Sequence, residues 1–375
     1  MSATIGALRE SVPAELRVSL VPETAEKFIK AQARILLEQG VGAAAQFPDA
    51  SYRNVAWGTA ASILAESDVL LTVQPLSLAQ IQALKPGAVV VGFMQPQARI
   101  AEVKALCDGR ITAFAMELVP RISRAQSMDA LSSQASIAGY KAVLIAANTL
   151  DRFLPMLTTA AGTIRPAQVL VIGAGVAGLQ AIATAKRLGA VVEAYDVRSA
   201  TREQVKSLGA KFVDTGVSAE GTGGYARELT QEEQRRQQDV LESRIAVADA
   251  VITTAAIPGR PAPRLISRAA VERMKPGAVI VDLAAESGGN CELTRAGETV
   301  LHGAVKIVGP VNLPAQLAYH ASEMYARNIF NFLKPALDKD GNLAIDWSDE
   351  VFARSCLTHD AAIRYEPIRK LVEGT

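Results

Sequence analysis

Several features that mark specialised protein classes are scarce in this sequence. It has three cysteines in 375 residues, Cys107, Cys291 and Cys356, far apart and odd in number, which favours reduced thiols in a cytoplasmic compartment over a disulfide framework. A net charge of +1 provides no bulk field to attract nucleic acid or a membrane. No apolar run reaches the ~18 residues of a membrane span, and we expect no signal peptide. Any attachment to a membrane is therefore expected to be made through another chain.

Motifs for several kinds of catalytic site are also missing. The sequence contains no HExxH pair, no cluster of Cys and His with metal-ligand spacing and no GxSxG nucleophile turn. We therefore predict neither a metal site nor a covalent nucleophile. Hydrophobic residues make up 49% of the chain and charged residues 21%, which is typical of a globular protein, and the length suffices for two domains.

Apolar strands alternate with helical patterns along nearly the whole chain, which is typical of a parallel sheet with helices on both faces. There is also an internal echo. A Lys-Pro-Gly turn and a buried strand at residues 85–91 recur at residues 275–281, and an acid, an apolar strand and Thr at residues 68–72 recur at residues 249–253. Lys-Pro-Gly before a strand is common turn chemistry, but two matches in order favour two related doubly wound domains.

Two long helices are expected at residues 132–150 and 314–333. The prediction is an α/β protein with two doubly wound, Rossmann-like, parallel-sheet domains joined by these helices, with a cleft between the domains. The first domain would be discontinuous, with residues 1–134 and 315–375, and the second would comprise residues 135–314. Ligands bind in such clefts and at the carboxyl ends of strands.

The most informative motif is the GxGxxG run of Gly173, Gly175 and Gly178. An apolar strand precedes it, a helix follows, and a second strand ends at the acid Asp196, which together form a dinucleotide-binding fingerprint. The first glycine permits the tight turn, the second lets a pyrophosphate approach the backbone, and the third lets helix and strand pack closely. A glycine-rich turn without a ligand is the alternative.

Asp196 indicates which nucleotide binds. A carboxylate there accepts hydrogen bonds from the adenosine ribose and repels a 2'-phosphate, which favours NAD(H) over NADP(H). Arg198 complicates this prediction because an arginine can accommodate a 2'-phosphate. With Asp196 in the first position, we interpret Arg198 as packing near the adenine.

Three further segments are candidates for the site. Residues 121–129 follow a short strand and contain Arg121, Gln126 and Asp129; they either hold a carboxamide, ribose or phosphate or form a solvated loop in which Asp129 caps the next helix. Residues 221–225 form a flexible linker or a lid. Residues 282–290 either let the nicotinamide lie close to the backbone or form a plain turn.

These segments together, in this order, resemble the NAD(H)-binding alpha subunit of proton-translocating nicotinamide nucleotide transhydrogenase. The resemblance spans almost the whole chain and includes the extension of the fingerprint through residue 190. The membrane domain of that family is absent here, so the chain resembles the split form, in which the NAD(H) component is a separate polypeptide. The resemblance implies direct hydride transfer between NAD(H) on this chain and NADP(H) on a partner component, coupled to proton translocation by a membrane component.

The resemblance also implies roles for individual residues. Arg121, Gln126, Asp129 and Ser132 would form the catalytic neighbourhood facing the nicotinamide, with Gln126 reaching toward the nucleotide of the partner. Together with the fingerprint, it predicts cofactor contacts at Arg121, Ile122, Ser123, Gly173, Gly175, Val176, Gly178, Asp196, Val197, Arg198, Gly224, Tyr225, Gln237 and Ala256. A homodimer is implied as well, located in the cytoplasm and peripheral to the inner membrane through the partner subunits.

Alanine dehydrogenase is a related family with the same two-domain fold. It needs a lysine and a histidine in its first domain to bind and deprotonate its substrate, and the matching positions here hold Gln74 and Gln95. Neither glutamine exchanges protons near neutral pH, which disfavours amino-acid oxidation. Hydride transfer between two nicotinamides needs positioning but no acid or base. A non-catalytic NAD-binding module remains the third hypothesis.

Overall fold

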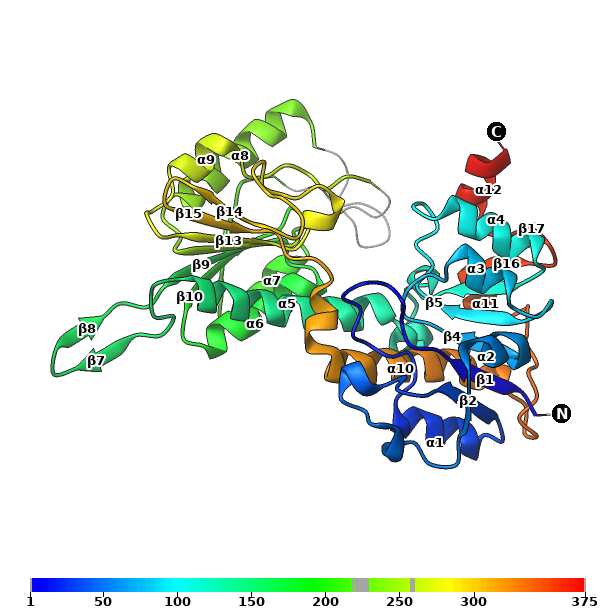
Figure 1. The fold of residues 1–375 in the computed structure, drawn as a ribbon. Helices are drawn as coiled ribbons and strands as arrows, with labels where there is room; N and C mark the ends of the chain where they lie inside the picture. Colours follow the sequence, from blue (N-terminus) through cyan, green and yellow to red (C-terminus); the bar gives the residue numbers. More distant parts are fainter. Residues whose placement is uncertain (1, 218, 220–228, 257–259, 374–375) are drawn as a thin grey trace. The chain divides into compact units, whose positions relative to one another are not determined.

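The computed structural model describes residues 2–217, 219, 229–256 and 260–373. The chain divides into two compact units, one comprising Met1–Gln134 with Pro314–Thr375 and the other comprising Ala135–Leu313. Each unit is a sheet with helices on both faces (Figure 1). In the part of the chain that the structure describes, no helix has the length and apolar character needed to cross a membrane.

The first unit contains an eight-stranded sheet in the order β17-β16-β6-β5-β4-β1-β2-β3. Its strands are β1 (Thr4–Ala7), β2 (Arg34–Glu38), β3 (Ala56–Gly58), β4 (Val69–Leu71), β5 (Val89–Gly92), β6 (Thr112–Ala115), β16 (Cys356–His359) and β17 (Ala362–Ile363). Strands β1 to β6 are parallel and follow the doubly wound order 3-2-1-4-5-6. The two carboxyl-terminal strands are added antiparallel at one edge.

Successive residues of these strands serve two separate cores, because side chains alternate across a sheet. Val69 and Leu71 belong to the core that includes α1 and α10, whereas Leu70 belongs to the core on the other face with α2, α3 and α4. The helices of this unit are α1 (Pro22–Lys30), α2 (Ala60–Glu66), α3 (Leu78–Gln82), α4 (Ile100–Asp108), α10 (Ala318–Leu333), α11 (Glu350–Ser355) and α12 (Glu366–Glu373). A sheet buried on both faces explains the continuous apolar runs in its strands.

The second unit repeats the same topology in a seven-stranded sheet, β11-β10-β9-β12-β13-β15-β14. Its strands are β9 (Gln168–Ile172), β10 (Val191–Tyr195), β11 (Lys211–Phe212), β12 (Ala250–Thr253), β13 (Val279–Asp282), β14 (Thr299–His302) and β15 (Val305–Val308). Among the described strands of this sheet, β14 alone is antiparallel to its neighbour, β15. The helices are α5 (Ala130–Thr149), α6 (Val176–Arg187), α7 (Thr201–Ser207), α8 (Gln231–Ile245) and α9 (Arg268–Glu272), and a hairpin of β7 (Leu157–Thr159) and β8 (Gly162–Ile164) projects from this unit (Figure 1).

The prediction of an α/β fold with two doubly wound parallel sheets is confirmed. The two long helices expected from the sequence are α5 and α10. The chain leaves the first unit within α5 and returns to it at Pro314, a few residues before α10. Helix α10 therefore lies wholly in the first unit, and a 3-10 turn, Leu313–Leu317, directly precedes it.

The repeated segments, residues 68–72 with 85–91 and residues 249–253 with 275–281, make the same hydrogen bonds in both units. In the first, a carboxylate oxygen of Asp68 accepts from Lys85 at 2.6 Å, and its other oxygen accepts from the backbone N–H of the first residue of β1 at 2.7 Å. In the second, Asp249 accepts from Lys275 at 2.9 Å and from the first N–H of β9 at 2.8 Å. Each aspartate thus ties the lysine before one strand to the amino end of the central strand. We call this arrangement the aspartate clamp.

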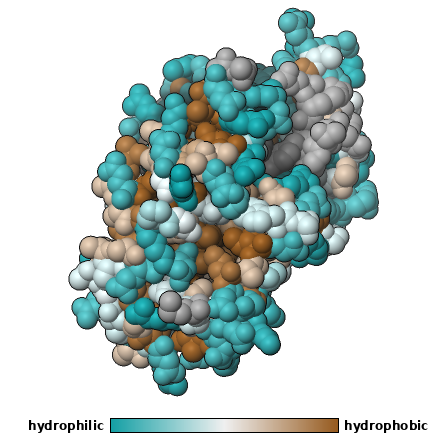
Figure 2. All heavy atoms as spheres, turned by 90° about the vertical axis from the view of Figure 1, so that its right-hand side faces the viewer, coloured by the Kyte–Doolittle hydropathy of each residue, from teal (hydrophilic) through white to brown (hydrophobic). Residues whose placement is uncertain are grey.

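The surface carries no continuous apolar face in the view of Figure 2, where hydrophobic residues show between hydrophilic ones. Apolar atoms normally contribute more than half of a folded protein's surface. The chain has 39 basic and 38 acidic residues, and hydrophilic and hydrophobic residues alternate over this face.

Candidate functional site

The glycine fingerprint lies where the sequence predicts it, between β9 and α6 in the second unit. Gly173 adopts φ 99°, a left-handed conformation that an L side chain rarely takes. A Cβ added at Gly178 would lie 1.8 Å from the carbonyl oxygen of Gly173. The turn is therefore tight, and the helix packs directly on it, as the roles of the first and third glycines require.

The middle glycine faces open space instead. Among the residues that the structure describes, a Cβ added at Gly175 would have one neighbour within 4 Å, the Nη2 atom of Arg198 at 3.9 Å. Gly175 is the N-cap of α6, no side chain caps this helix, and the side chain of Val176 is 41% exposed. The amino end of α6 thus combines an accessible backbone with a favourable dipole, which fits the pyrophosphate of a dinucleotide.

Asp196 closes this turn from the end of β10. One of its carboxylate oxygens accepts from the backbone N–H of Ala174 at 2.7 Å. Arg198 donates from its Nε and Nη2 atoms to the two oxygens, at 2.8 and 2.7 Å, and its backbone N–H donates at 2.9 Å. The acid is 7% exposed. The sequence did not reveal this bidentate pair, which places the guanidinium beside Gly175 and next to the carboxylate.

The other predicted nucleotide contacts of this unit differ in exposure. Val197 follows Asp196 and is half-buried, and Ala256 is exposed after β12. Gln237, in α8, is 8% exposed, and its Nε2 atom donates to the hydroxyl of Tyr195 at 2.8 Å. Burial raises the pKa of Tyr195. Two further predicted contacts, Gly224 and Tyr225, lie outside the described residues.

The segment of residues 121–129 belongs to the first unit and is more regular than the loop that the sequence suggests. Ser123–Met128 form a 3-10 helix, η4, in which Ala125 and Met128 are buried in the core. The side chains of Arg121 and Gln126 are exposed, and Ile122 is half-buried. The buried pair anchors the segment while its polar side chains face outward.

Three side chains from the carboxyl-terminal region of the first unit hold this segment. Asn328 and Asn331, in α10, donate to the carbonyl oxygen of Ser127 at 2.9 and 3.2 Å. Arg124 pairs with both carboxylate oxygens of Asp349, which also caps α11. Pairing with Arg124 lowers the pKa of Asp349. Helix η4 is therefore fixed by residues more than 190 positions away in the sequence.

Asp129 forms the cap that the alternative interpretation predicts. Its Oδ1 atom accepts from the backbone N–H of Ser132 at 2.8 Å, and its Oδ2 atom accepts from the hydroxyl of Ser132 at 2.6 Å. These contacts start α5 and orient Ser132 toward Asp129. Arg121, Gln126, Asp129 and Ser132 thus lie within one continuous stretch at the end of β6 and the start of α5.

The two glutamines expected from the sequence at the positions of a dehydrogenase's lysine and histidine contact each other. Gln95 Nε2 donates to Gln74 Oε1 at 3.0 Å, and Gln74 Nε2 donates to Glu15 at 2.7 Å. Glu15 forms a buried ion pair with Arg17 at 2.7 Å, and Arg17 donates to Gln134 at 2.8 Å. Although burial acts in the opposite direction, hydrogen bonds and the charge of Arg17 lower the pKa of Glu15. The result is a hydrogen-bonded chain in which neither glutamine side chain can exchange a proton.

Two more carboxyl groups bind backbone amides at the same strand ends. Glu10 accepts from the N–H groups of Val73 and Gln74, at 2.6 and 3.2 Å, and Glu117 accepts from those of Met94 and Gln95, with bonds of 2.6 to 3.2 Å. Burial raises the pKa of Glu10 to about 7 and also raises that of Glu117. Neither residue could be predicted from the sequence, because pairing between distant segments leaves no local pattern.

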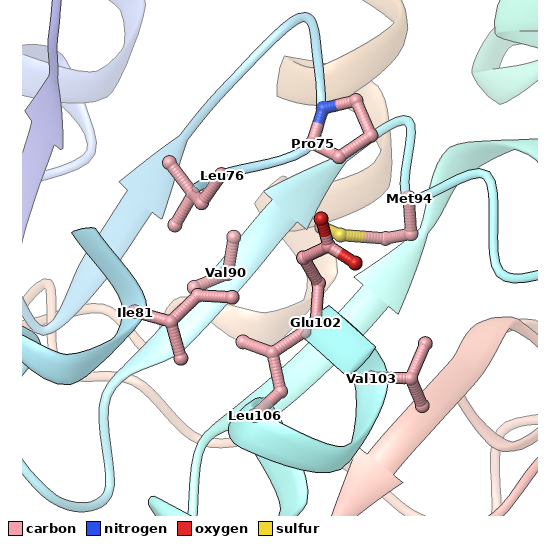
Figure 3. A pocket seen from close by; sticks show the side chains of 8 residues that line it. All are labelled: Pro75, Leu76, Ile81, Val90, Met94, Glu102, Val103 and Leu106. Atoms are coloured by element: carbon pink, nitrogen blue, oxygen red, sulfur yellow. The ribbon is translucent and has the colours of Figure 1, made fainter. Parts of the chain in front are cut away.

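A small apolar pocket lies between β5, α3 and α4 in the first unit (Figure 3). It is lined by Pro75, Leu76, Ile81, Val90, Met94, Glu102, Val103 and Leu106. Glu102 is its single charged side chain, and this carboxylate pairs with Arg99 at 3.1 Å. A pocket with this lining offers no donor for a phosphate, and the fingerprint belongs to the other unit. Among the described residues, no group of three or more His, Cys, Asp or Glu side chains could hold a metal ion.

Comparison with known proteins identifies the family. The model "Alanine dehydrogenase/PNT, N-terminal domain" matches residues 6–138, and "Alanine dehydrogenase/PNT, C-terminal domain" matches residues 142–366. The first portion of NAD(P) transhydrogenase subunit alpha from Rhodospirillum rubrum is 47% identical over 95% of this chain and 96% of its own length. The protein of the same name from Rickettsia prowazekii is 42% identical over 99% and 98%.

Solved structures agree with this relationship. A transhydrogenase from Sinorhizobium meliloti superposes with a TM-score of 0.88 at 45% identity, covering 96% of this chain and 99% of that one. An L-alanine dehydrogenase superposes with a TM-score of 0.82 at 21% identity, covering 99% of both chains, and so shares the fold. The chain, with its paired Rossmann-like units and open glycine turn, therefore belongs to the alanine dehydrogenase and transhydrogenase family, among the alpha subunits of NAD(P) transhydrogenase.

Proposed function

We propose that this chain is the NAD(H)-binding component of a proton-translocating transhydrogenase. Hydride would pass directly between NAD(H) held here and NADP(H) held by a partner component, coupled to proton translocation by a membrane component. One contrast carries the proposal. In the second unit, the glycine turn leaves space at Gly175, and Asp196 accepts a hydrogen bond from the same turn. In the first unit, the expected positions of a dehydrogenase's acid and base hold Gln74 and Gln95, which are hydrogen-bonded to each other.

The residues of the second unit fit the cofactor at its phosphate and ribose groups. The accessible backbone at Gly175 and the amino end of α6 would bind the pyrophosphate. Asp196 would accept hydrogen bonds from the hydroxyls of the adenosine ribose. Because Arg198 already donates to this carboxylate, its side chain would either move away or share the carboxylate with the ribose. When bound, the nicotinamide supplies the position that gives or takes the hydride. The acid at the end of β10 supports NAD(H) here and leaves NADP(H) to the partner.

The stretch from Arg121 to Ser132 would orient the reacting rings. The side chains of Arg121 and Gln126 are exposed, while Ala125, between them in the sequence, is buried in the core. Asp129 holds Ser132 through two hydrogen bonds, which keeps both side chains in one geometry. Positioning of this kind is what a direct transfer needs from the protein. Ile122 and Ser123 would extend the same contact surface.

An amino-acid dehydrogenase is the main competing function, and the hydrogen-bonded glutamines disfavour it. Removing a proton from an amino acid needs a base within hydrogen-bonding reach, and neither Gln74 nor Gln95 provides one. A non-catalytic NAD-binding module would share the fingerprint but would not need Gln126. Substitution of Gln126 separates a binding module from a transhydrogenase component, because a binding module would keep its full function without this side chain.

We also propose a homodimer in which the β7-β8 hairpin contacts a second copy. Two-stranded hairpins are at best marginally stable alone in water, and this one carries Ile164, 45% exposed, and lies close in sequence to Met156, 63% exposed. Covering these side chains with a second chain would stabilise both. Attachment to the inner membrane would be peripheral, through the partner subunits.

The test is reconstitution. The purified chain is mixed with an NADP(H)-binding transhydrogenase component, and reduction of an NADP analogue by NADH is followed by absorbance. We expect a rate well above that of either chain alone and no reduction of NAD by alanine. Alanine-dependent NAD reduction without a partner would establish the dehydrogenase instead. Absence of transfer in the mixture, with NADH bound, would contradict the proposal.

A further inference from the structure

Asn290 is a fully buried polar residue that the proposed function does not yet use. It lies in the second unit, eight residues after β13, and its relative exposure is 0%. Its Nδ2 atom donates to the carbonyl oxygens of Ala255 and Pro263, both at 2.8 Å, and its Oδ1 atom accepts from the N–H of Ala255 at 3.1 Å. The side-chain amide therefore satisfies both backbone groups of Ala255, as a neighbouring strand would.

Ala255 in turn adjoins the fingerprint. The preceding residue, Thr254, donates its hydroxyl to the carbonyl oxygen of Gly173 at 3.0 Å and its N–H to that of Ile172 at 2.8 Å. A Cβ added at Gly173 would approach the nitrogen of Ala255 to 3.2 Å. The carboxyl ends of β9, β12 and β13 are thus joined through direct contacts that run from Gly173 to Asn290.

Asn290 is itself held firmly by its neighbours. Its carbonyl oxygen accepts from the N–H groups of Leu265 and Ile266, at 2.8 and 3.0 Å. Asp282, also fully buried, accepts from the N–H of the next residue, Cys291, at 3.0 Å. Because its own backbone is fixed on both sides, Asn290 can determine where Ala255 lies.

The position of Ala255 suggests which part of the cofactor it serves. Asp196 lies at the end of β10, on one side of β9, and the pyrophosphate site lies at Gly175, after β9. The strand on the other side of β9 is β12, where the order of strands reverses and ligands of this fold class bind. A dinucleotide with its adenosine near Asp196 and its pyrophosphate at Gly175 must extend its other half past the end of β12.

We propose that Asn290 is a positioning residue for the nicotinamide half of NAD(H). It acts through the backbone of Ala255, which it fixes beside the fingerprint turn, and so through the exposed Ala256 that follows in the chain. This inference rests on the proposed NAD(H) site. An amide is required because it donates twice and accepts once here. Alanine would leave the amide and carbonyl of Ala255 unsatisfied, and aspartate would place a carboxylate against two carbonyl oxygens.

The experiment compares two probes on the full-length chain. NADH contains the nicotinamide half, whereas ADP-ribose ends at the ribose next to the pyrophosphate. For Asn290→Ala, we expect the Kd for NADH to rise about tenfold with an unchanged Kd for ADP-ribose. Without the amide, the backbone of Ala255 moves to other hydrogen-bond partners, and returning it to the binding geometry costs about one hydrogen bond. Asn290→Ser leaves no buried charge and cannot make all three hydrogen bonds, so it should weaken NADH binding in the same way, and it decides the matter if the alanine variant does not fold.

Glu292→Gln is the matched control, two residues away and exposed, where the carboxylate binds the backbone N–H of Arg268. It should bind both probes like the wild type. An equal weakening of both probes by the Asn290 variants, or wild-type affinity for NADH, would overturn the inference. A wild-type chain that does not bind NADH would instead contradict the proposed function, so the two failures are distinguishable.

Discussion

The three fingerprint glycines differ in what surrounds them, and this difference predicts opposite effects of two alanine substitutions. At Gly178 the new Cβ would lie 1.8 Å from a backbone oxygen, whereas at Gly175 it would lie 3.9 Å from the end of a flexible arginine side chain. Gly178→Ala should therefore damage the fold. Gly175→Ala should leave the fold intact and damage nucleotide binding.

The size of the first effect follows from two opposing contributions. Forcing a methyl group against the backbone oxygen of Gly173 costs about 3 kcal/mol, the upper end for overpacking. Alanine inside a helix recovers about 1 kcal/mol over glycine. The net loss of about 2 kcal/mol corresponds to a fall in Tm of about 4 to 8 °C for a domain of this size.

The second effect appears in binding. The φ of −76° at Gly175 suits alanine. A poorer N-cap costs about 0.5 to 1 kcal/mol, but the loss of unfolded-state entropy returns about 0.4 to 1 kcal/mol. The Tm should therefore hardly change. Blocking the approach of the pyrophosphate to the backbone should remove a hydrogen bond to a charged group, about 1.5 to 3 kcal/mol, which weakens NADH at least about tenfold.

Thermal unfolding by circular dichroism and titration of NADH fluorescence measure the two quantities on the same samples. We expect Gly178→Ala to lower Tm, and Gly175→Ala to raise the Kd for NADH at unchanged Tm. Wild-type NADH affinity in Gly175→Ala would refute the assignment of the pyrophosphate to this turn. Wild-type Tm in Gly178→Ala would refute the packing argument.

Three further predictions concern other regions of the chain. Asp196→Asn should narrow the preference for NADH over NADPH, measured as the ratio of their Kd values. The carboxylate that repels a 2'-phosphate is then gone, while Arg198 remains. An unchanged ratio would show that other residues set the preference. Arg124→Ala should lower the rate of hydride transfer a fewfold at unchanged Kd for NADH, since it releases η4 from Asp349, and a variant that exchanges the two charges should recover the rate. Burial raises the pKa of Glu10 in the folded state from 4.5 to about 7, so its contribution to stability is complete below pH 4.5 and is lost as the pH rises through 7. Glu10→Gln should therefore flatten the fall in unfolding free energy between pH 5 and 8. An equally steep fall in this variant would show that other groups cause it.

Local patterns were enough to predict the regular elements near the fingerprint. The strand, glycine turn, helix and second strand around Gly173 are confirmed, since each depends on residues close in sequence. The echo at Lys85 and Lys275 likewise predicted two related sheets, and both copies form the same clamp.

Contacts between distant segments were not predictable from the sequence. The buried pair of Glu15 and Arg17 looks like two ordinary surface charges until the fold brings Gln74 and Gln134 to it. The regular turn of η4 was expected to be a loop, because its anchor, Asn328, follows about 200 residues later. Capping by Asp129 was one of two interpretations that the local pattern allowed, and the structure shows this cap, while the role of the segment in binding a ligand stays a prediction.

The aspartate clamp has a consequence for how this fold diverges. Both copies keep the same aspartate and lysine at the amino ends of their strands, while the opposite ends differ, with an open glycine turn in one unit and strand ends bound by Glu10 and Glu117 in the other. Architecture and chemistry are therefore encoded at opposite edges of each sheet. A duplicated ancestral unit could change its ligand, or give it up, without rewriting the residues that hold its strands in register.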